Sequence, residues 1–192
     1  FVIAMLFYFK GLFRGQASNV VILMAALMPI FTLLFSHFIL GTVLQGYQSV
    51  AFILLCLGGL ILFFTEQKTV RFSVLFYVIL AATVMSFSNT VSKLVFNDTN
   101  FVTGFVWMKI GGILTAFCFL FFKQVRTSIT TITPQKVAQS RLGYLGNRLY
   151  AGIGSALLQY AILLGIPPLV DATASVQFVV VLIFSYILLK ER

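Results

Sequence analysis

The chain has 192 residues, of which 60% are hydrophobic and only 9% are charged, and its formal net charge is +9. A soluble domain carries about 25% charged residues, so this composition excludes an ordinary soluble globular protein. The apolar residues come in runs that are long enough for membrane helices, which need about 20 residues to cross the hydrocarbon core.

Seven apolar segments are predicted to form membrane helices, because only helices or closed barrels span a bilayer and these runs are continuous rather than alternating. In chain order they cover residues 1–12, 17–40, 48–64, 72–96, 101–122, 148–165 and 169–189. The first helix is partial, since the sequence starts with Phe1 inside an apolar run, and we interpret the chain as a fragment of a longer protein. Pro29 lies near the middle of the second helix and predicts a kink, because proline removes a helix hydrogen bond.

The connections between these helices are polar. Residues 97–100 are Asn-Asp-Thr-Asn, a composition typical of helix caps and Asx turns. Residues 123–147 form the one long polar loop. Pro167 and Pro168 precede the last predicted helix, where proline fits the first turn.

Charge divides the connections into two sets if successive helices alternate in direction. One set holds every Lys and Arg of the chain except Lys93 and Lys109, and the other holds Asp98 and Asp171. Cytoplasmic loops of membrane proteins collect Lys and Arg, so the basic set is predicted to face the cytoplasm. This rule also explains the positive net charge without a nucleic-acid partner, and we expect none.

Two similar segments lie at the ends of helices that are predicted to run in opposite directions. Residues 35–40 read Phe-Ser-His-Phe-Ile-Leu, and residues 184–189 read Phe-Ser-Tyr-Ile-Leu-Leu. Similar sequence in opposite orientation indicates an inverted repeat, a common architecture of transporters.

The second predicted helix also resembles the EamA-type branch of the drug/metabolite transporter superfamily. Residues 25–31 read Ala-Ala-Leu-Met-Pro-Ile-Phe, and residues 38–41 read Phe-Ile-Leu-Gly. The family has a small-residue helix there with a central proline and a Leu-Gly-Glu ending, although Thr42 replaces the Glu. The Gly-Gly pair at residues 58–59 is similar to the family's glycine-bearing fifth helix. The second copy, residues 172–191, lacks the proline.

The resemblance implies a fold. It predicts an all-α membrane protein whose roughly seven transmembrane helices come from a ten-helix bundle of two inverted repeats. Residues 1–64 would be the C-terminal part of the first EamA-like repeat, and residues 72–192 the second repeat without its last helix. Family members usually have both termini in the cytoplasm, which would place Lys10 and Arg14 outside, and we follow the charge distribution instead.

Lys109 and Lys93 are the first functional candidates, because an ionisable group at a membrane-helix centre costs about 2.5–3.5 kcal/mol. Lys109 would hold an anionic or carboxylate group of a substrate, or form a buried pair with Asp171 or Asp98. The resemblance places Lys109 where the family often has a basic residue, in the second helix of a repeat.

A polar stripe runs along the fourth predicted helix. Its members recur at helical spacing and are flanked by Asn89: Thr83, Ser86, Thr90 and Lys93. The stripe is predicted to face the bundle interior. It would either line a substrate path that includes Asn89 and Lys93, or join helices by hydrogen bonds while Lys93 extends toward the interface.

Three further residues complete the predicted substrate-binding set. Trp107 would form a pocket wall or pack at the interface, and the mid-helix amides of Gln159 and Gln177 would orient a substrate or join helices. Pro29 is the predicted hinge. No Asp or Glu is predicted deep within an apolar run, so no carboxylate proton relay is expected.

Catalytic and cofactor motifs are missing from the sequence. Cys56 and Cys118 lie in separate apolar runs without metal-ligand spacing, and we expect no metal, cofactor or catalytic residue. The predicted function is a secondary transporter of small polar metabolites, an exporter or exchanger that works by alternating access. The alternative is a membrane-embedded scaffold or enzyme without transport activity. We expect a multi-pass protein of the cell (plasma) membrane whose partners are a small-molecule substrate and the lipid bilayer, with a homodimer left open.

Overall fold

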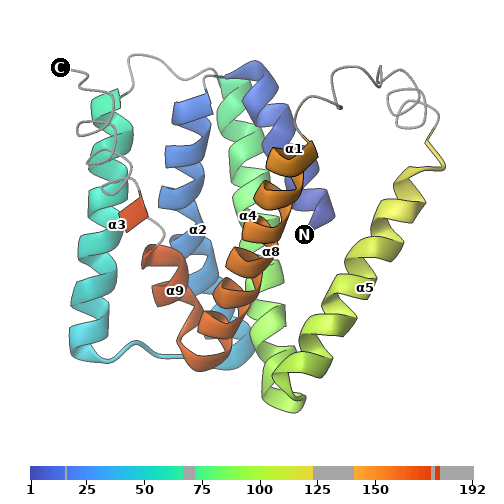
Figure 1. Ribbon diagram of the computed structural model, residues 1–192. Coiled ribbons are helices and arrows are strands. Elements are labelled where there is room, and N and C mark those ends of the chain that lie inside the picture. Colours follow the sequence, from blue (N-terminus) through green and yellow to red (C-terminus); the bar gives the residue numbers. More distant parts are fainter. Residues whose placement is uncertain (16, 67–71, 123–140, 174–175, 178–192) are drawn as a thin grey trace.

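The computed structural model describes residues 1–15, 17–66, 72–122, 141–173 and 176–177. These residues form helices and no strand (Figure 1). The helices are α1 (Val2–Arg14), α2 (Ala17–Leu40), α3 (Gly46–Glu66), α4 (Phe72–Asp98), α5 (Phe101–Phe119), α8 (Arg141–Leu164) and α9 (Pro167–Thr173). Within them, α2, α4 and α5 contain apolar spans that are long enough to cross a membrane, and α3 contains a shorter apolar segment, Gly46–Ile61. The predicted all-helical membrane class is therefore confirmed, with three full-length spans in the described residues.

The predicted helix bounds agree closely with the structure except near α8 and α9. Helix α8 begins at Arg141 rather than at residue 148, where the sequence predicted a polar loop. The polar residues before residue 148 belong to the helix, and Arg148 bonds Tyr144 one turn earlier, through Nε–H to the hydroxyl at 3.0 Å. Helix α9 is described only to Thr173, and most of the predicted helix over residues 169–189 lies outside the described residues.

Helix ends follow local chemistry. Gly41 has φ of 63°, a left-handed conformation that favours glycine, and its N–H donates to the His37 carbonyl at 3.1 Å, so α2 stops there. The Gln48 side chain accepts the backbone N–H of Gln45 at 3.0 Å, at the start of α3. Asn100 is the N-cap of α5, as the composition of residues 97–100 indicated, although its side chain makes no cap hydrogen bond.

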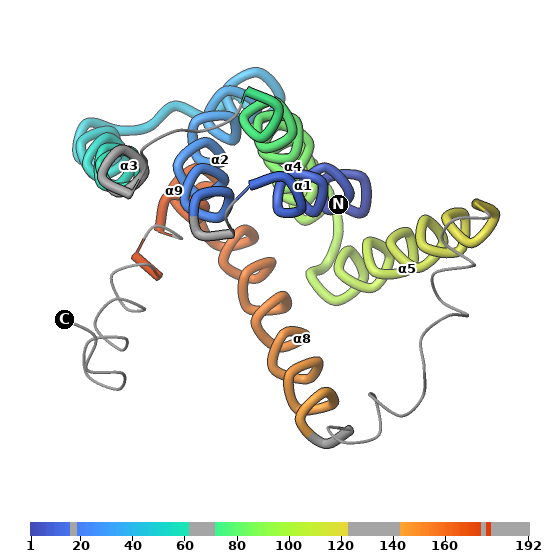
Figure 2. Tube along the Cα trace, turned by 90° about the horizontal axis from the view of Figure 1, so that it is seen from above, coloured from blue at the N-terminus to red at the C-terminus, as the bar shows by residue number. Residues whose placement is uncertain are grey.

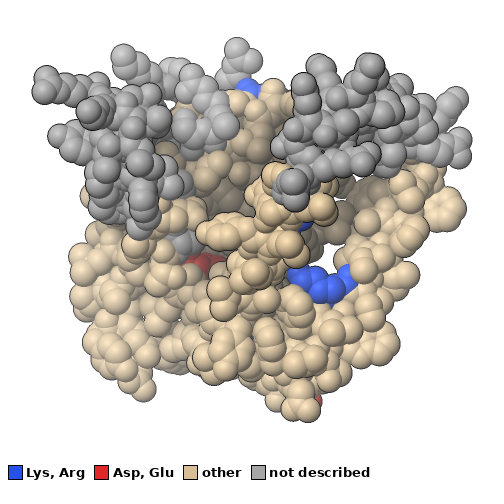
Figure 3. Space-filling model, viewed as in Figure 1, with Lys and Arg blue, Asp and Glu red and all other residues tan. Residues whose placement is uncertain are grey.

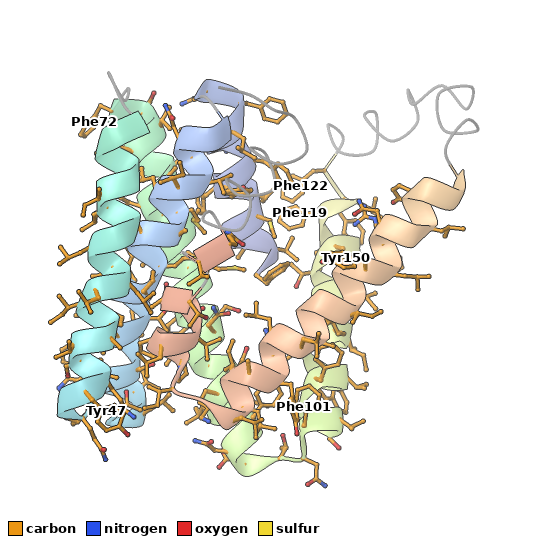
Figure 4. All side chains as sticks on the ribbon, turned by 60° about the vertical axis from the view of Figure 1, so that its left-hand side comes forward. Tyr47, Phe72, Phe101, Phe119, Phe122 and Tyr150 are labelled. Carbon is orange, nitrogen blue, oxygen red and sulfur yellow. The ribbon has the colours of Figure 1, made fainter. Side chains whose placement is uncertain are left out.

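Consecutive long helices run in alternating directions (Figure 1). The end of α1 at Arg14 and the start of α4 lie at one end of the bundle, and the connection from α4 to α5 lies at the other. Figure 4 shows Tyr47 and Phe101 near this second end and Phe72 at the first. Tyr47 is 73% exposed and Phe72 is 81% exposed. Aromatic residues at both ends are typical of membrane interfaces.

The most tightly packed part of the bundle is formed by α1, α2, α4 and α9, with α2 against α4 as the most extensive contact. Val20 and Leu23 of α2 pack against Val74 and Val78 of α4. Phe52 and Cys56 of α3 pack against Ala172 of α9 on the other side of α2. Ala26, Ala81 and Ala82 are all completely buried, which fits membrane bundles, where small residues let helices approach closely.

Helices α5 and α8 diverge from this packed group (Figure 2). They touch each other through an edge-to-face contact between Phe101 and Tyr160, whose ring centroids are 5.3 Å apart. Residues 143–154 of α8 are exposed on every face. Figure 3 shows that most of the described surface on this side is uncharged, with basic and acidic atoms in a few small patches.

Candidate functional site

A buried carboxylate is the centre of the candidate site. Asp171 of α9 is only 4% exposed, and side chains of two other helices donate hydrogen bonds to it. The Thr32 hydroxyl of α2 donates to Oδ2 at 2.5 Å. The Asn89 amide of α4 donates to Oδ1 at 2.9 Å and to Oδ2 at 3.2 Å. We call Thr32, Asn89 and Asp171 the three-helix cluster.

The three-helix cluster lies inside the bundle, about two thirds of the way along α2 and α4 from their starts. Helices rise about 1.5 Å per residue, so Thr32 lies about 12 Å from the end of α2 at Leu40, and Asn89 about 14 Å from the end of α4 at Asp98. These two ends lie at the same side of the bundle. A typical hydrocarbon core is about 30 Å thick, so a group this far from the helix ends lies within the span of such a core rather than at its surface.

The position of Asp171 corrects two predictions. The sequence was interpreted as placing Asp171 in a connection between helices and no carboxylate deep within the protein. In the structure, Pro167 and Pro168 are themselves buried and start α9, which turns back into the bundle and carries Asp171 inside. A proline pair therefore redirects the chain here rather than marking the surface.

Further polar groups surround the three-helix cluster. The Ser86 hydroxyl donates to the Met28 carbonyl at 2.9 Å and joins α4 to α2 beside Pro29. Thr90 donates to the Ser86 carbonyl within α4 at 3.0 Å. Ser36, one turn beyond Thr32, is fully buried, and its hydroxyl has no partner among the described residues.

The polar stripe of α4 faces inward, as predicted. Ser86, Asn89 and Thr90 are buried, and Thr83 and Lys93 are half-buried. The Lys93 ammonium donates to the backbone carbonyl of Leu163. This carbonyl is in the last turn of α8, where carbonyls lack helical donors, so Lys93 caps α8 and ties it to α4.

Lys109 occupies a different place. It is exposed, and its ammonium donates to the Ser155 hydroxyl of α8 at 2.8 Å and lies 4.8 Å from the centroid of the Phe105 ring. The predicted alternative, a buried pair with Asp171 or Asp98, is wrong. Lys109 instead bridges α5 to α8.

The remaining predicted site residues are dispersed. Gln159 of α8 is half-buried, and its Oε1 is buried without a partner among the described residues. Trp107 is 67% exposed, and Gln177 is exposed beyond α9. Pro29 is fully buried inside α2, three residues before Thr32. Asn89 is the one predicted substrate-binding residue that belongs to the three-helix cluster.

Sequence reasoning missed Thr32, Ser36 and Asp171. Thr32 and Ser36 looked like ordinary small polar residues in an apolar helix, which are common in membrane proteins. A usable signal was present, because Thr32 follows Pro29 by one turn and Asp171 follows the proline pair by one turn. Polar groups beside interrupted helices are typical of transport sites.

Chemically, the site holds one carboxylate, hydroxyls and amides. Among the described residues, no group of three or more His, Cys, Asp or Glu side chains is placed to hold a metal ion. The arrangement can bind polar groups by hydrogen bonds or accept a proton on the carboxylate.

A multi-helix bundle in which buried polar side chains join several helices, beside prolines within or at the start of those helices, is typical of a membrane transport protein. Comparison with known families agrees, because residues 1–65 match the EamA-like transporter family. This N-terminal part of the chain is thus an EamA-like transporter family domain, which confirms the resemblance drawn from the sequence. Members of this family are membrane transporters of the drug/metabolite type and typically not enzymes. No curated protein and no solved structure matched the chain.

Proposed function

We propose that the protein is a secondary transporter that moves small polar metabolites across the cell (plasma) membrane, as an exporter or exchanger, by alternating access. The observation that supports this most directly is the three-helix cluster, in which buried polar side chains join α2, α4 and α9. Transporters place their sites inside the bundle, where polar groups of several helices meet. The family match of residues 1–65 supports the same function.

The proposed architecture is an inverted repeat within a ten-helix bundle. Residues 1–64 would form the end of the first repeat, and residues 72–192 the second repeat without its last helix. The family match ends at residue 65, next to this boundary, and α2 and α4 carry polar groups from both sides of it to one place. A site at the interface between repeats is expected for alternating access.

The proposed substrate contacts come from α4, α5, α8 and the segment after α9: Asn89, Lys93, Trp107, Lys109, Gln159 and Gln177. Asn89 and Lys93 lie one turn apart on the inner face of α4, and Gln159 has a buried amide oxygen available. Lys109 offers a cation for a carboxylate group where α5 and α8 are joined. Pro29, beside Thr32, is the proposed hinge. Lipid and a small-molecule substrate are the proposed partners, and a homodimer is compatible with the exposed faces of α5 and α8.

The test is counterflow in proteoliposomes made with the purified protein. Vesicles are loaded with one member of a panel of amino acids, organic acids and amines, and uptake of the labelled form is measured. We expect uptake above that of protein-free vesicles for at least one panel member. Equal uptake in both kinds of vesicle would leave a scaffold or a membrane-embedded enzyme as the better assignment.

Variants locate the site once a substrate is found. Lys109→Ala and Asn89→Leu are expected to reduce counterflow at least tenfold, a loss equivalent to about 1.4 kcal/mol. Thr83→Val is the matched control, because Thr83 is on α4 and its hydroxyl bonds only the Ile79 carbonyl of its own helix. Counterflow that is unchanged in the first two variants would reject these residue assignments while leaving the transport function intact.

A further inference from the structure

We propose that Asp171 is a proton-binding site, and that its protonation controls how α9 is held against α2 and α4. This inference rests on the proposed transport function, to which it adds proton coupling. It starts from the geometry of the three-helix cluster, in which every hydrogen bond given to the carboxylate comes from another helix.

The closed surroundings of the carboxylate favour a proton over a larger ligand. Thr32 is 0% exposed, Asn89 3% and Asp171 4%, so the cluster is closed to solvent. A bound molecule needs a cavity, so Asn89 would reach a substrate only after α9 moves away, whereas a proton can bind in this arrangement. Thr32 and Asn89 also present an O–H and N–H to the carboxylate, and hard metal cations require oxygen ligands in greater number than this cluster offers.

The hydrogen bonds allow both protonation states. In the ionised state, Asp171 accepts from Thr32 and Asn89. When a proton adds to Oδ2, the new O–H donates to the Thr32 oxygen, and the Thr32 hydroxyl turns its own hydrogen away, because a hydroxyl both donates and accepts. The freed hydrogen has a usual acceptor in the helix carbonyl one turn earlier. Oδ1 continues to accept from Asn89, so the step adds one proton and removes one negative charge.

Few titratable groups on the packed elements compete with this role. His37 of α2 is exposed and bonds the Thr42 carbonyl, and Cys56 of α3 packs against Ala172. Lys93 of α4 is directed to the Leu163 carbonyl. The other titratable residues of α3, α4 and α8 whose side chains are described are Tyr47, Tyr77, Asp98, Tyr144, Arg148, Tyr150 and Tyr160. Among the described residues, none forms an ion pair with Asp171.

Protonation changes the strength of the contact that fixes α9. Hydrogen bonds to a charged carboxylate are roughly twice as strong as those between neutral groups. Adding a proton therefore weakens the hold of Thr32 and Asn89 on α9. Both α2 and α9 contain prolines within about one turn of the cluster, at Pro29 and at Pro167 and Pro168, so both can shift there. A proton can thereby bias two arrangements of α9, which is what coupling requires.

The direct test is pH-difference infrared spectroscopy of the purified protein in liposomes. We expect a protonated-carboxyl band that grows as the pH is lowered, disappears in Asp171→Asn and persists in Asp98→Asn. Asp98 is the matched control because it is exposed at the end of α4. Persistence of the whole band in Asp171→Asn, or no titrating band in the wild type beyond that of Asp98, would overturn the proposal.

Two further measurements test the same proposal independently. Thr32→Val and Thr32→Ser compare loss of the hydroxyl with its retention, and only Thr32→Val is expected to shift the midpoint of the band. In proteoliposomes, a pH gradient should drive accumulation by the wild type and by Asp98→Asn but not by Asp171→Asn. Counterflow by the wild type with no response to a pH gradient would reject proton coupling alone, whereas absent counterflow would reject the transport function.

Discussion

The bundle has two regions in which residues of the same kinds are buried to different extents. In the first, α1, α2, α4 and α9 pack closely, and 44% of the apolar span of α2 is buried. In the second, α5 and α8 diverge, and only 6% of the apolar span of α5 is buried. Figure 4 shows Tyr150 of α8 in this second region, and it is 79% exposed. Apolar composition is alike in both, so burial against protein does not follow from hydrophobicity in a membrane helix.

The comparison shows in which region polar side chains form hydrogen bonds between helices. In the packed region, hydroxyls and amides bond partners on other helices, as Ser86 does with the Met28 carbonyl. In the second region, formed by α5 and α8, Thr115 bonds the Gly111 carbonyl of its own helix, and Lys109 bonds Ser155 of α8. Interhelical polar contacts therefore gather where helices are close, and this is where a proton or substrate can alter packing.

The largest expected effect comes from removing packing at the end of α8 that contacts α4 and α9, but not along the part of α8 that diverges from them. Ile162 and Ile153 are both on α8, but Ile162 is 0% exposed and Ile153 is 61% exposed. Ile162→Ala is expected to destabilise the fold by about 2 kcal/mol, the low end of the range for such cavities, because lipid rather than water solvates the unfolded helix. Ile153→Ala should be within about 0.5 kcal/mol of the wild type. Unfolding in mixed micelles measures both, and equal losses would remove the distinction between the two parts of α8.

A smaller effect is expected from hydroxyl groups. Thr32→Val removes the hydrogen bond to the buried carboxylate and should cost about 1.5 kcal/mol, the lower value for bonds to charged groups. Thr115→Val is the matched change in α5 and should be nearly neutral, because its hydroxyl bonds only its own helix. The same unfolding assay measures the difference at neutral pH. A neutral Thr32→Val would show that the Thr32 hydroxyl does not stabilise the buried carboxylate.

The smallest expected effect on stability is at Lys109, which joins α5 to α8. Lys109→Met removes the bond to Ser155 and the contact with the Phe105 ring, and it should cost only about 0.5 kcal/mol because the Lys109 side chain is exposed. Substitution of Lys109 should therefore reduce counterflow strongly while leaving stability nearly unchanged. A large loss of stability would show that Lys109 mainly holds α5 to α8, and its proposed contact with substrate would then lack support.

Much of the fold could be predicted from the sequence because the signals are local. The length of an apolar run sets a helix, and Gly41 or the Pro167-Pro168 pair sets an end or a start. The inward face of α4 followed from the spacing of Thr83, Ser86, Thr90 and Lys93 alone. Membership of an EamA-like transporter domain also followed from local motifs in the second helix.

The candidate site could not be predicted in the same way. Thr32, Asn89 and Asp171 are far apart in the sequence, and only Asn89, beside the polar stripe of α4, was predicted as a site residue. Only the packing of α9 between neighbouring helices decided that Asp171 is buried and that Asn89, rather than Lys109, is its partner. The physical reason is that hydrophobicity places a helix in the membrane, whereas close contact between particular helices determines which polar groups meet.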